Sequence, residues 1–170
     1  MKKLLMPAII FAILLQLSVP TYMIFNKYNI LKTGEEFRFR VSPVDPYDAF
    51  RGRYVSLNVR HDARGEGEYG VIEVAADGFA NISFITNTKP AYGAYVKSDE
   101  PSWFSFPVDR YYMDEKLAPR AETLTQRIDS DRETYISVRV KKGALVISGL
   151  FIDGVAIEDI VKTSIIGKEQ

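Results

Sequence analysis

The chain has 170 residues, of which 46% are apolar and 26% are charged, a balance typical of a folded domain. Its 22 basic and 22 acidic residues cancel and are interleaved, which argues against a nucleic-acid binder with a clustered basic face. Cysteine is absent, which excludes thiolate metal sites, redox dithiols and cysteine nucleophiles.

The N-terminal segment has the features of a transmembrane helix. No charged side chain occurs from Leu4 to Asn26, and about 20 apolar residues suffice to cross the hydrocarbon core. Lys2 and Lys3 precede this segment, and the positive-inside rule predicts that they stay in the cytoplasm. Pro20 predicts that the helix kinks or ends near Val19.

Two alternatives to an uncleaved anchor are open. A cleaved signal peptide has an apolar region of about 7–15 residues and a small-residue cleavage site, and neither feature is found here. A core helix fits poorly with an uncharged N-terminal segment led by two lysines. We therefore predict a transmembrane anchor with a short cytoplasmic N-terminus over residues 1–27, a linker over 28–34 and an extracytoplasmic β domain over 35–170. The predicted location is a bacterial inner membrane.

From residue 35 onward apolar and polar residues alternate, as in strands with one buried face. The alternation assigns these residues to the buried face: Phe37, Phe39, Val41, Val55, Leu57, Val59, Ile136, Val138 and Val140. Arg38 and Arg40 fall on the opposite face. Three turn pairs separate neighbouring runs: Asp77-Gly78, Lys142-Gly143 and Asp153-Gly154. Such pairs predict hairpins, because glycine adopts a positive φ without steric cost.

A short helix is predicted over residues 118–128, where apolar residues recur at helical spacing and Pro119 suits the first turn. The fold class predicted from these elements is mainly β. We expect an antiparallel sandwich or small barrel with one short helix, preceded by a single N-terminal transmembrane helix.

A first polar segment precedes the strand that begins near Arg53. Asp45 initiates a turn with the following proline, Asp48 is suited to cap a short helical turn, and Arg51 is placed to pair with either carboxylate. Gly52 supplies backbone freedom where the strand starts. Two interpretations are open: a loop held by an Arg–Asp pair, or a ligand site.

The run from Gly52 to Val59 resembles the signature of the GDYXXLXY family of membrane-associated bacterial proteins. Gly52, Tyr54 and Leu57 match the signature, whereas Arg53 replaces its aspartate and Val59 replaces its final tyrosine. The resemblance implies a membrane-associated domain, sometimes encoded beside or fused to multi-spanning membrane proteins. It supplies no activity, and the change at Arg53 argues against a shared mechanism through a carboxylate at that position.

A second segment, from Trp103 to Glu115 with Glu122 downstream, resembles the Arg-Tyr-Tyr…Glu block of the same family. Arg110 is placed to pair with Glu115 or Glu122. An aromatic surface around that pair is expected from Trp103, Tyr111 and Tyr112. The segment suits either a binding site for a carboxylate, sugar or polar headgroup, or an ion-paired loop. Because the two segments occur together, we expect Asp45, Arg51, Arg110 and Glu115 to meet in space.

Catalytic motifs are sparse. His61 is the sole histidine, so no multi-histidine metal site exists, and there is no G-x-S-x-G elbow, P-loop or GxGxxG. Paired carboxylates keep one enzyme class open: Glu115 with Asp48 or Glu122 would suit an envelope glycan hydrolase.

The leading prediction is a non-catalytic binding or assembly module with no cofactor and no nucleic-acid partner. It is expected to be an accessory subunit of a multi-spanning membrane protein. The alternatives are the glycan hydrolase and a sensor domain for a small polar ligand. The candidate residues are Asp45, Asp48, Arg51, Gly52, Tyr54, Leu57, Arg110, Tyr111, Tyr112, Glu115 and Glu122.

Overall fold

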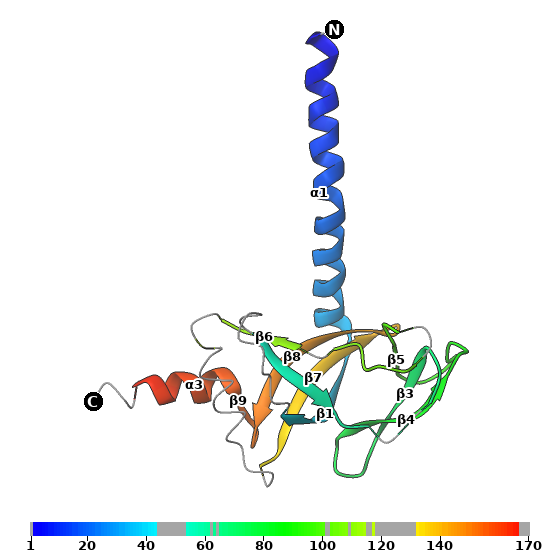
Figure 1. Cartoon of the computed structure of the whole chain (residues 1–170), viewed down its shortest axis with the longest axis vertical. Helices are drawn as coiled ribbons and strands as arrows, with labels where there is room; N and C mark the ends of the chain where they lie inside the picture. Colours follow the sequence, from blue (N-terminus) through cyan, green and yellow to red (C-terminus); the bar gives the residue numbers. More distant parts are fainter. Residues whose placement is uncertain are drawn as a thin grey trace.

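The computed structural model describes residues 2–43, 54–61, 63, 65–100, 103–108, 110–114, 117 and 132–166. A long helix, α1 (Lys2–Thr33), stands on a β domain that ends in a short helix, α3 (Ile157–Ile166) (Figure 1). The strands are β1 (Glu35–Pro43), β2 (Tyr54–Val59), β3 (Tyr69–Val74), β4 (Ala80–Thr86), β5 (Tyr95–Lys97), β6 (Arg110–Tyr112), β7 (Thr134–Lys141), β8 (Ala144–Ile152) and β9 (Val155–Ala156).

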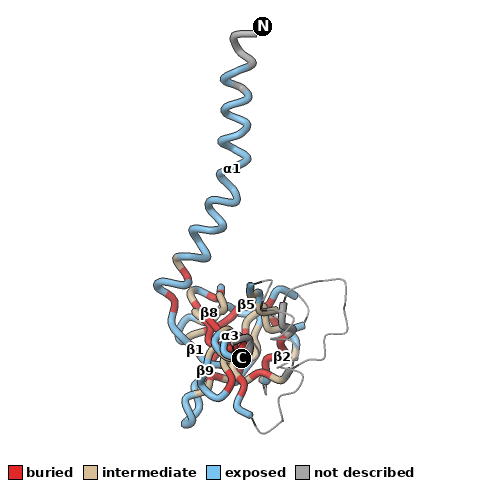
Figure 2. The backbone as a smooth tube through the Cα atoms, turned by 90° about the vertical axis from the view of Figure 1, so that its left-hand side faces the viewer, coloured by how far each residue is buried: buried red, intermediate tan, exposed pale blue. Residues whose placement is uncertain are grey.

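The helix α1 projects away from the sheet, and its described side chains from Met6 to Tyr28 are exposed (Figure 2). The stretch Ile9–Thr33 is long and apolar enough to cross a membrane, with a mean hydropathy of 1.8. The sequence allowed either a kink at Pro20 or a helix end near Val19, and because Pro20 lies inside the helix, the end is excluded. The axis of α1 instead changes direction part-way along its length in Figure 2. A bend of this kind is what an internal proline produces, because it removes one backbone hydrogen bond.

The last turns of α1 are docked on the sheet, although our sequence analysis places a linker at 28–34. Ile30 is only 3% exposed and anchors the helix over β7 and β8. The Lys141 Nζ donates hydrogen bonds to Asn29 Oδ1 at 3.3 Å and to Thr33 Oγ1 at 2.5 Å. The helix therefore continues into the domain without an intervening flexible segment.

Gly34 makes the tight turn from α1 into β1. Its N–H donates to the Ile30 carbonyl at 2.7 Å, and its own carbonyl accepts from Arg139 Nη1 at 3.2 Å. A Cβ at this position would lie 2.5 Å from the Ile30 oxygen and 3.1 Å from the Val140 nitrogen. Only glycine fits this close approach of helix and sheet.

The described strands form one mixed sheet, which confirms the mainly β prediction. The order is β5-β3-β4-β1-β7-β8-β9, with β2 paired to β1 and β6. β1 is the hub, because it pairs antiparallel with β7 and β2 and in parallel with β4. A bridge between Val96 and Gly143 brings β5 to the β7–β8 turn, and the sheet curls over its core without closing. The result is sandwich-like.

The predicted hairpin turns are confirmed. Lys142-Gly143 joins β7 to β8 with φ angles of 52° and 84°, and Asp153-Gly154 joins β8 to β9 with 51° and 80°. Asp77-Gly78 lies between β3 and β4, which pair antiparallel. Two consecutive positive φ angles match the right-handed twist of the flanking strands.

The core lies between the curled sheet, α3 and the segment before β6. The alternation prediction is confirmed at eight positions that are at most 6% exposed: Phe37, Phe39, Val41, Leu57, Val59, Ile136, Val138 and Val140. The side chain of Val55 lies outside the described part of the chain, as does the predicted helix at 118–128. The structure adds α3, which the sequence analysis did not predict. α3 contributes Ile157 and Val161 to the core, both 0% exposed.

Candidate functional site

The two segments that carry the family resemblance are neighbours in the sheet. β2 and β6 pair antiparallel over three positions: Tyr54 with Tyr112, Val55 with Tyr111, and Ser56 with Arg110. The strands of the two segments therefore meet in space, whereas the expected meeting of Asp45, Arg51 and Glu115 with Arg110 involves residues outside the described part of the chain. Backbone pairing fixes which side chains of one segment stand beside those of the other.

β2 joins this site to the core. On its other edge it pairs with β1, where Val59 lies opposite Val41 and Leu57 opposite Pro43. Leu57 is 6% exposed and Val59 is 5% exposed. The leucine of the signature is therefore a core residue, and its role is to hold the strand that carries the rest of the site.

Tyr111 connects β6 to α3. Its hydroxyl donates a short hydrogen bond to Glu158 Oε1, and both side chains are half-buried. Burial of the phenol raises the pKa of Tyr111 well above its usual range, and the hydrogen bond to the Glu158 carboxylate raises it further. Both effects disfavour a second negative charge beside the carboxylate, so Tyr111 remains a neutral donor.

Glu158 is a site residue that the sequence analysis missed. It lies in the first turn of α3 together with Asp159, where acidic side chains favour the positive end of the helix dipole. Ile157 and Val161 are spaced four residues apart, as buried positions on one helical face are. These two signals together could have predicted a helix beginning at Ile157.

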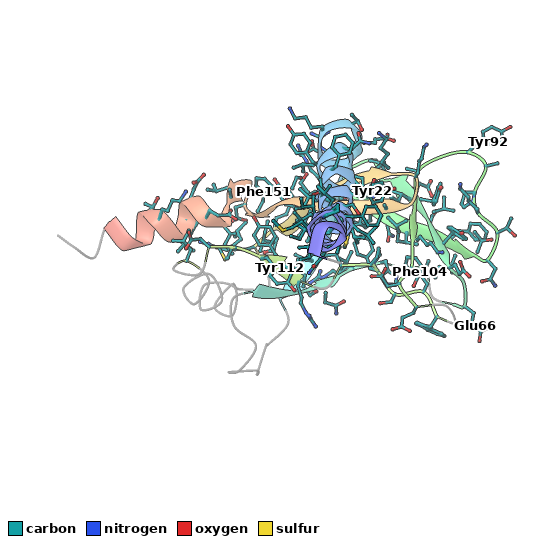
Figure 3. The ribbon with its side chains drawn as sticks, turned by 90° about the horizontal axis from the view of Figure 1, so that it is seen from above. Tyr22, Glu66, Tyr92, Phe104, Tyr112 and Phe151 are labelled. Carbon is teal, nitrogen blue, oxygen red and sulfur yellow. The ribbon has the colours of Figure 1, made fainter. Side chains whose placement is uncertain are left out.

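Tyr112 projects differently from its neighbour. It is 69% exposed, whereas Tyr111 is half-buried, as the alternation of side chains along a strand requires. Seen from above the domain, Tyr112 lies close to the axis of α1 (Figure 3). β6 itself lies at the end of the domain nearest α1 (Figure 1). An exposed aromatic ring is thus presented on the side from which α1 leaves.

Several predicted site residues lie outside the described part of the chain: Asp45, Asp48, Arg51, Gly52, Glu115 and Glu122. The side chain of Tyr54 also lies outside it, although its backbone belongs to β2. The predicted Arg–Asp pair, the pairing of Arg110 with a glutamate and the carboxylate geometry of a glycan hydrolase all fall on these residues. They remain predictions.

The expected aromatic cluster is divided between two places. The Trp103 carbonyl accepts from Ser98 Oγ at 3.3 Å, next to β5. The neighbouring ring of Phe104 packs edge-on against His61 at 5.8 Å between centroids, and a Cβ on Gly70 would meet it at 2.5 Å. In Figure 3, Phe104 and Tyr112 lie on opposite sides of α1. The segment holding Trp103 thus packs beside β3, away from Tyr112.

The contacts of His61 hold the local fold together. Its Nδ1 donates to the Ala63 carbonyl at 2.8 Å, and its ring rests on Phe104. Among the described residues, no group of three or more His, Cys, Asp or Glu side chains could hold a metal ion.

On the outer face of the sheet, Arg40 links two turns. Its guanidinium forms ion pairs with Asp77 at 2.7 Å and with Glu133 at 3.3 Å, and it lies 3.9 Å from the centre of the Phe79 ring. The hydrogen bond from Arg40 holds the pKa of the Asp77 carboxyl below its usual range. Next to these residues on the same face, the ring of Tyr135 stacks on the ring of Phe151, with centroids 5.2 Å apart. These contacts stabilise the outer face of the sheet, where the Arg60 N–H, just after β2, also donates to the Arg40 carbonyl at 3.0 Å.

Comparison with known proteins gives one match. The sequence model of the family described as GDYXXLXY protein matches residues 16–150. No curated protein and no solved structure matches the chain. The matched range includes the second half of α1 and both paired motif segments.

Proposed function

The chain belongs to the GDYXXLXY family, and from that premise we propose that it is a membrane-anchored assembly module. In this proposal α1 crosses the bacterial inner membrane once with its N-terminus inside. The β domain lies outside the cytoplasm, at the membrane surface. Its role is to bind a multi-spanning membrane protein as an accessory subunit.

The observation that carries the proposal is the rigid junction between α1 and the sheet. A helix with exposed apolar side chains from Met6 to Tyr28 needs a lipid or protein environment. A flexible tether would suffice to keep a domain near a membrane. Here Ile30 is buried and Lys141 donates hydrogen bonds to the last turn of α1, so the β domain has a fixed orientation relative to the helix. A fixed orientation is what simultaneous contact with a partner inside and outside the bilayer requires.

One face of α1 is suited to a partner helix. Leu14, Ser18, Thr21 and Phe25 follow at spacings of three or four residues, so their side chains lie in one row along the helix. Ser18 Oγ donates to the Leu15 carbonyl of its own helix at 2.7 Å. Small hydroxyl-bearing residues allow close approach and interhelical hydrogen bonds within membranes. This row would contact a helix of the partner.

The β2–β6 pair supports the same role outside the bilayer. The exposed Tyr112 ring lies near the axis of α1, so a partner that packs along α1 would meet it as it leaves the membrane. Tyrosine supplies a large contact area together with a polar hydroxyl, which is why it is enriched in protein interfaces.

Topology is tested first, with alkaline phosphatase and a fluorescent protein fused in turn after Gln170. Active phosphatase with a dark fluorophore is expected. Fluorescence without phosphatase activity would contradict the proposed orientation and leave a cytoplasmic module tethered by α1.

The partner is tested by purification of the full chain in a mild detergent. We expect a stoichiometric multi-spanning membrane protein that is lost in Ser18→Leu. The matched control is Gln16→Leu, because residue 16 lies about 200° around the helix from residue 18. Absence of a stoichiometric membrane partner would contradict the proposal. Equal loss of the partner in both variants would show that the row containing Ser18 is not the contact face.

A further inference from the structure

Three lysines from distant parts of the chain surround one hollow beside the last turns of α1. The hollow has a volume of about 460 Å³ and is lined by Lys27, Lys97, Ser98, Asp99, Lys142 and Gly143, among others. Lys27 comes from α1, Lys97 from β5 and Lys142 from the β7–β8 turn. Asp99 is the sole carboxylate in this lining. The hollow is therefore cationic.

Backbone contacts hold these walls in place. The Lys97 N–H donates to the Gly143 carbonyl at 2.9 Å, which joins β5 to the β7–β8 turn. Lys27 Nζ lies 3.4 Å from the Leu145 carbonyl oxygen, to which it donates. Lys97 Nζ lies 3.5 Å from Glu68 Oε2, a distance at which the ammonium keeps donors for a second anion.

Ser98 is not available to a ligand as a simple donor. Its Oγ donates to the Trp103 carbonyl at 3.3 Å and accepts from the N–H groups of Glu100 and Ser105 at 3.1 Å and 3.0 Å. The hydroxyl instead fixes the loop that forms one wall. Recognition in the hollow thus falls to the ammonium groups, which suit an anion such as phosphate better than a neutral sugar.

The position of Lys27 in α1 sets the height of the hollow relative to the membrane. The uncharged stretch from Leu4 to Asn26 is about 34 Å long as a helix, against a hydrocarbon core of about 30 Å. Lys27 is the first charged residue after it, so in the proposed membrane-spanning arrangement it falls in the headgroup layer. β5 and the end of β7 lie beside the base of α1 (Figure 1), and Lys97 and Lys142 line the same hollow as Lys27.

We propose that this hollow binds the phosphate of an anionic phospholipid headgroup in the leaflet that the β domain faces. The inference rests on the membrane anchoring in the proposed function, and it adds a ligand that the anchoring alone does not require. The docked turns of α1 keep the three ammonium groups at headgroup depth. Binding a lipid there would fix the height and tilt of the β domain.

The test uses the full chain in mild detergent, with lipid adducts counted by native mass spectrometry. Added phosphatidylglycerol is expected to give discrete adducts, and phosphatidylcholine is expected to give far fewer. Lys97→Gln and Lys142→Asn should each weaken phosphatidylglycerol binding by about fivefold. Asparagine is chosen at 142 because it tolerates the φ of 52° found there.

The matched control is Lys162→Gln, which removes the same charge from α3 on the opposite side of the domain from β5 (Figure 1). It should leave adduct formation unchanged. Equal loss in the control, or equal binding of the two lipids, would overturn the proposal. Competition by inorganic phosphate at similar concentration would assign the hollow to a free anion and overturn the lipid as its ligand.

This measurement is separate from the test of the proposed function. Counting lipid adducts on the chain in detergent requires neither the partner protein nor a particular orientation of the chain in the cell. Loss of the partner with retained adducts would count against the assembly module alone. Loss of adducts in Lys97→Gln, with co-purification unchanged, would support the lipid site independently of the partner.

Discussion

The hydroxyl of Tyr111 donates a hydrogen bond to the carboxylate of Glu158, which is 47 residues further along the chain. This bond joins β6 of the family motif to α3, the last helix of the domain. α3 in turn is held by Ile157 and Val161, which are both fully buried. The packing of α3 in the core therefore stabilises β6 through this hydrogen bond, although α3 contributes no residue to the family motif.

Tyr111→Phe should destabilise the β domain by about 1–3 kcal/mol, because it leaves the half-buried Glu158 carboxylate without its donor. The matched control is Tyr92→Phe. Tyr92 is 92% exposed (Figure 3), so loss of its hydroxyl should change stability by less than about 0.5 kcal/mol. Thermal unfolding of the full chain in detergent, followed by near-ultraviolet circular dichroism, measures both. Equal effects of the two variants would show that the bond to Glu158 contributes nothing.

The same bond predicts a pH dependence. The folded-state pKa of Tyr111 is raised, so the folded chain retains a proton that the unfolded chain loses above about pH 10. The stability contributed by Tyr111 is therefore fully present below about pH 10 and is lost as the pH rises above it. The difference in unfolding free energy between the unmodified chain and Tyr111→Phe should be constant at lower pH and shrink above pH 10. A difference that grows with pH would contradict the assigned direction.

Local patterns predicted much of the sheet. Strict alternation assigned Phe39, Val59 and Ile136 to the core because a half-buried strand requires period two. The turn pair Lys142-Gly143 predicted its hairpin because glycine adopts a positive φ without steric cost, and in the structure both residues have a positive φ. Strand alternation and turn pairs depend only on residues that are neighbours in the chain, so the sequence is sufficient to predict them.

Long-range features were harder to predict. The parallel pairing of β1 with β4 joins Phe39 to Ala80, and no local signal specifies it. The docking of the last turns of α1 depends on the burial of Ile30 against β7 and β8, a tertiary contact that no local pattern specifies. The bond between Tyr111 and Glu158 likewise requires knowledge of where α3 packs.

The junction between α1 and the sheet can be tested at Ile30. Ile30→Ala should destabilise the domain by about 2–4 kcal/mol, because it opens a cavity beneath the helix. Leu31→Ala is the control, since Leu31 is 40% exposed and should cost less than about 1 kcal/mol. Amide hydrogen exchange over residues 28–34 should be slow in the unmodified chain and faster in Ile30→Ala. Fast exchange in the unmodified chain would contradict a rigid junction and favour the linker predicted from sequence.

A pair of glycines separates backbone strain from side-chain crowding. Gly78 and Gly143 have almost the same φ, 83° and 84°, but a Cβ on Gly78 would meet nothing within 4 Å. A Cβ on Gly143 would lie 2.6 Å from the Tyr95 ring, at the point where β5 meets the β7–β8 turn.

Both alanine variants pay the strain of a positive φ, about 1 kcal/mol. Gly143→Ala should cost about 1–3 kcal/mol more than Gly78→Ala, because the Tyr95 ring must move or the bridge to β5 must open. Thermal unfolding in detergent measures the difference. Because Gly143 and its neighbour Lys142 also line the cationic hollow, opening of the bridge should weaken phosphatidylglycerol adducts in Gly143→Ala and leave them intact in Gly78→Ala. Equal stability of the two variants would mean that β5 is not held against the turn, and that the hollow lacks a fixed wall.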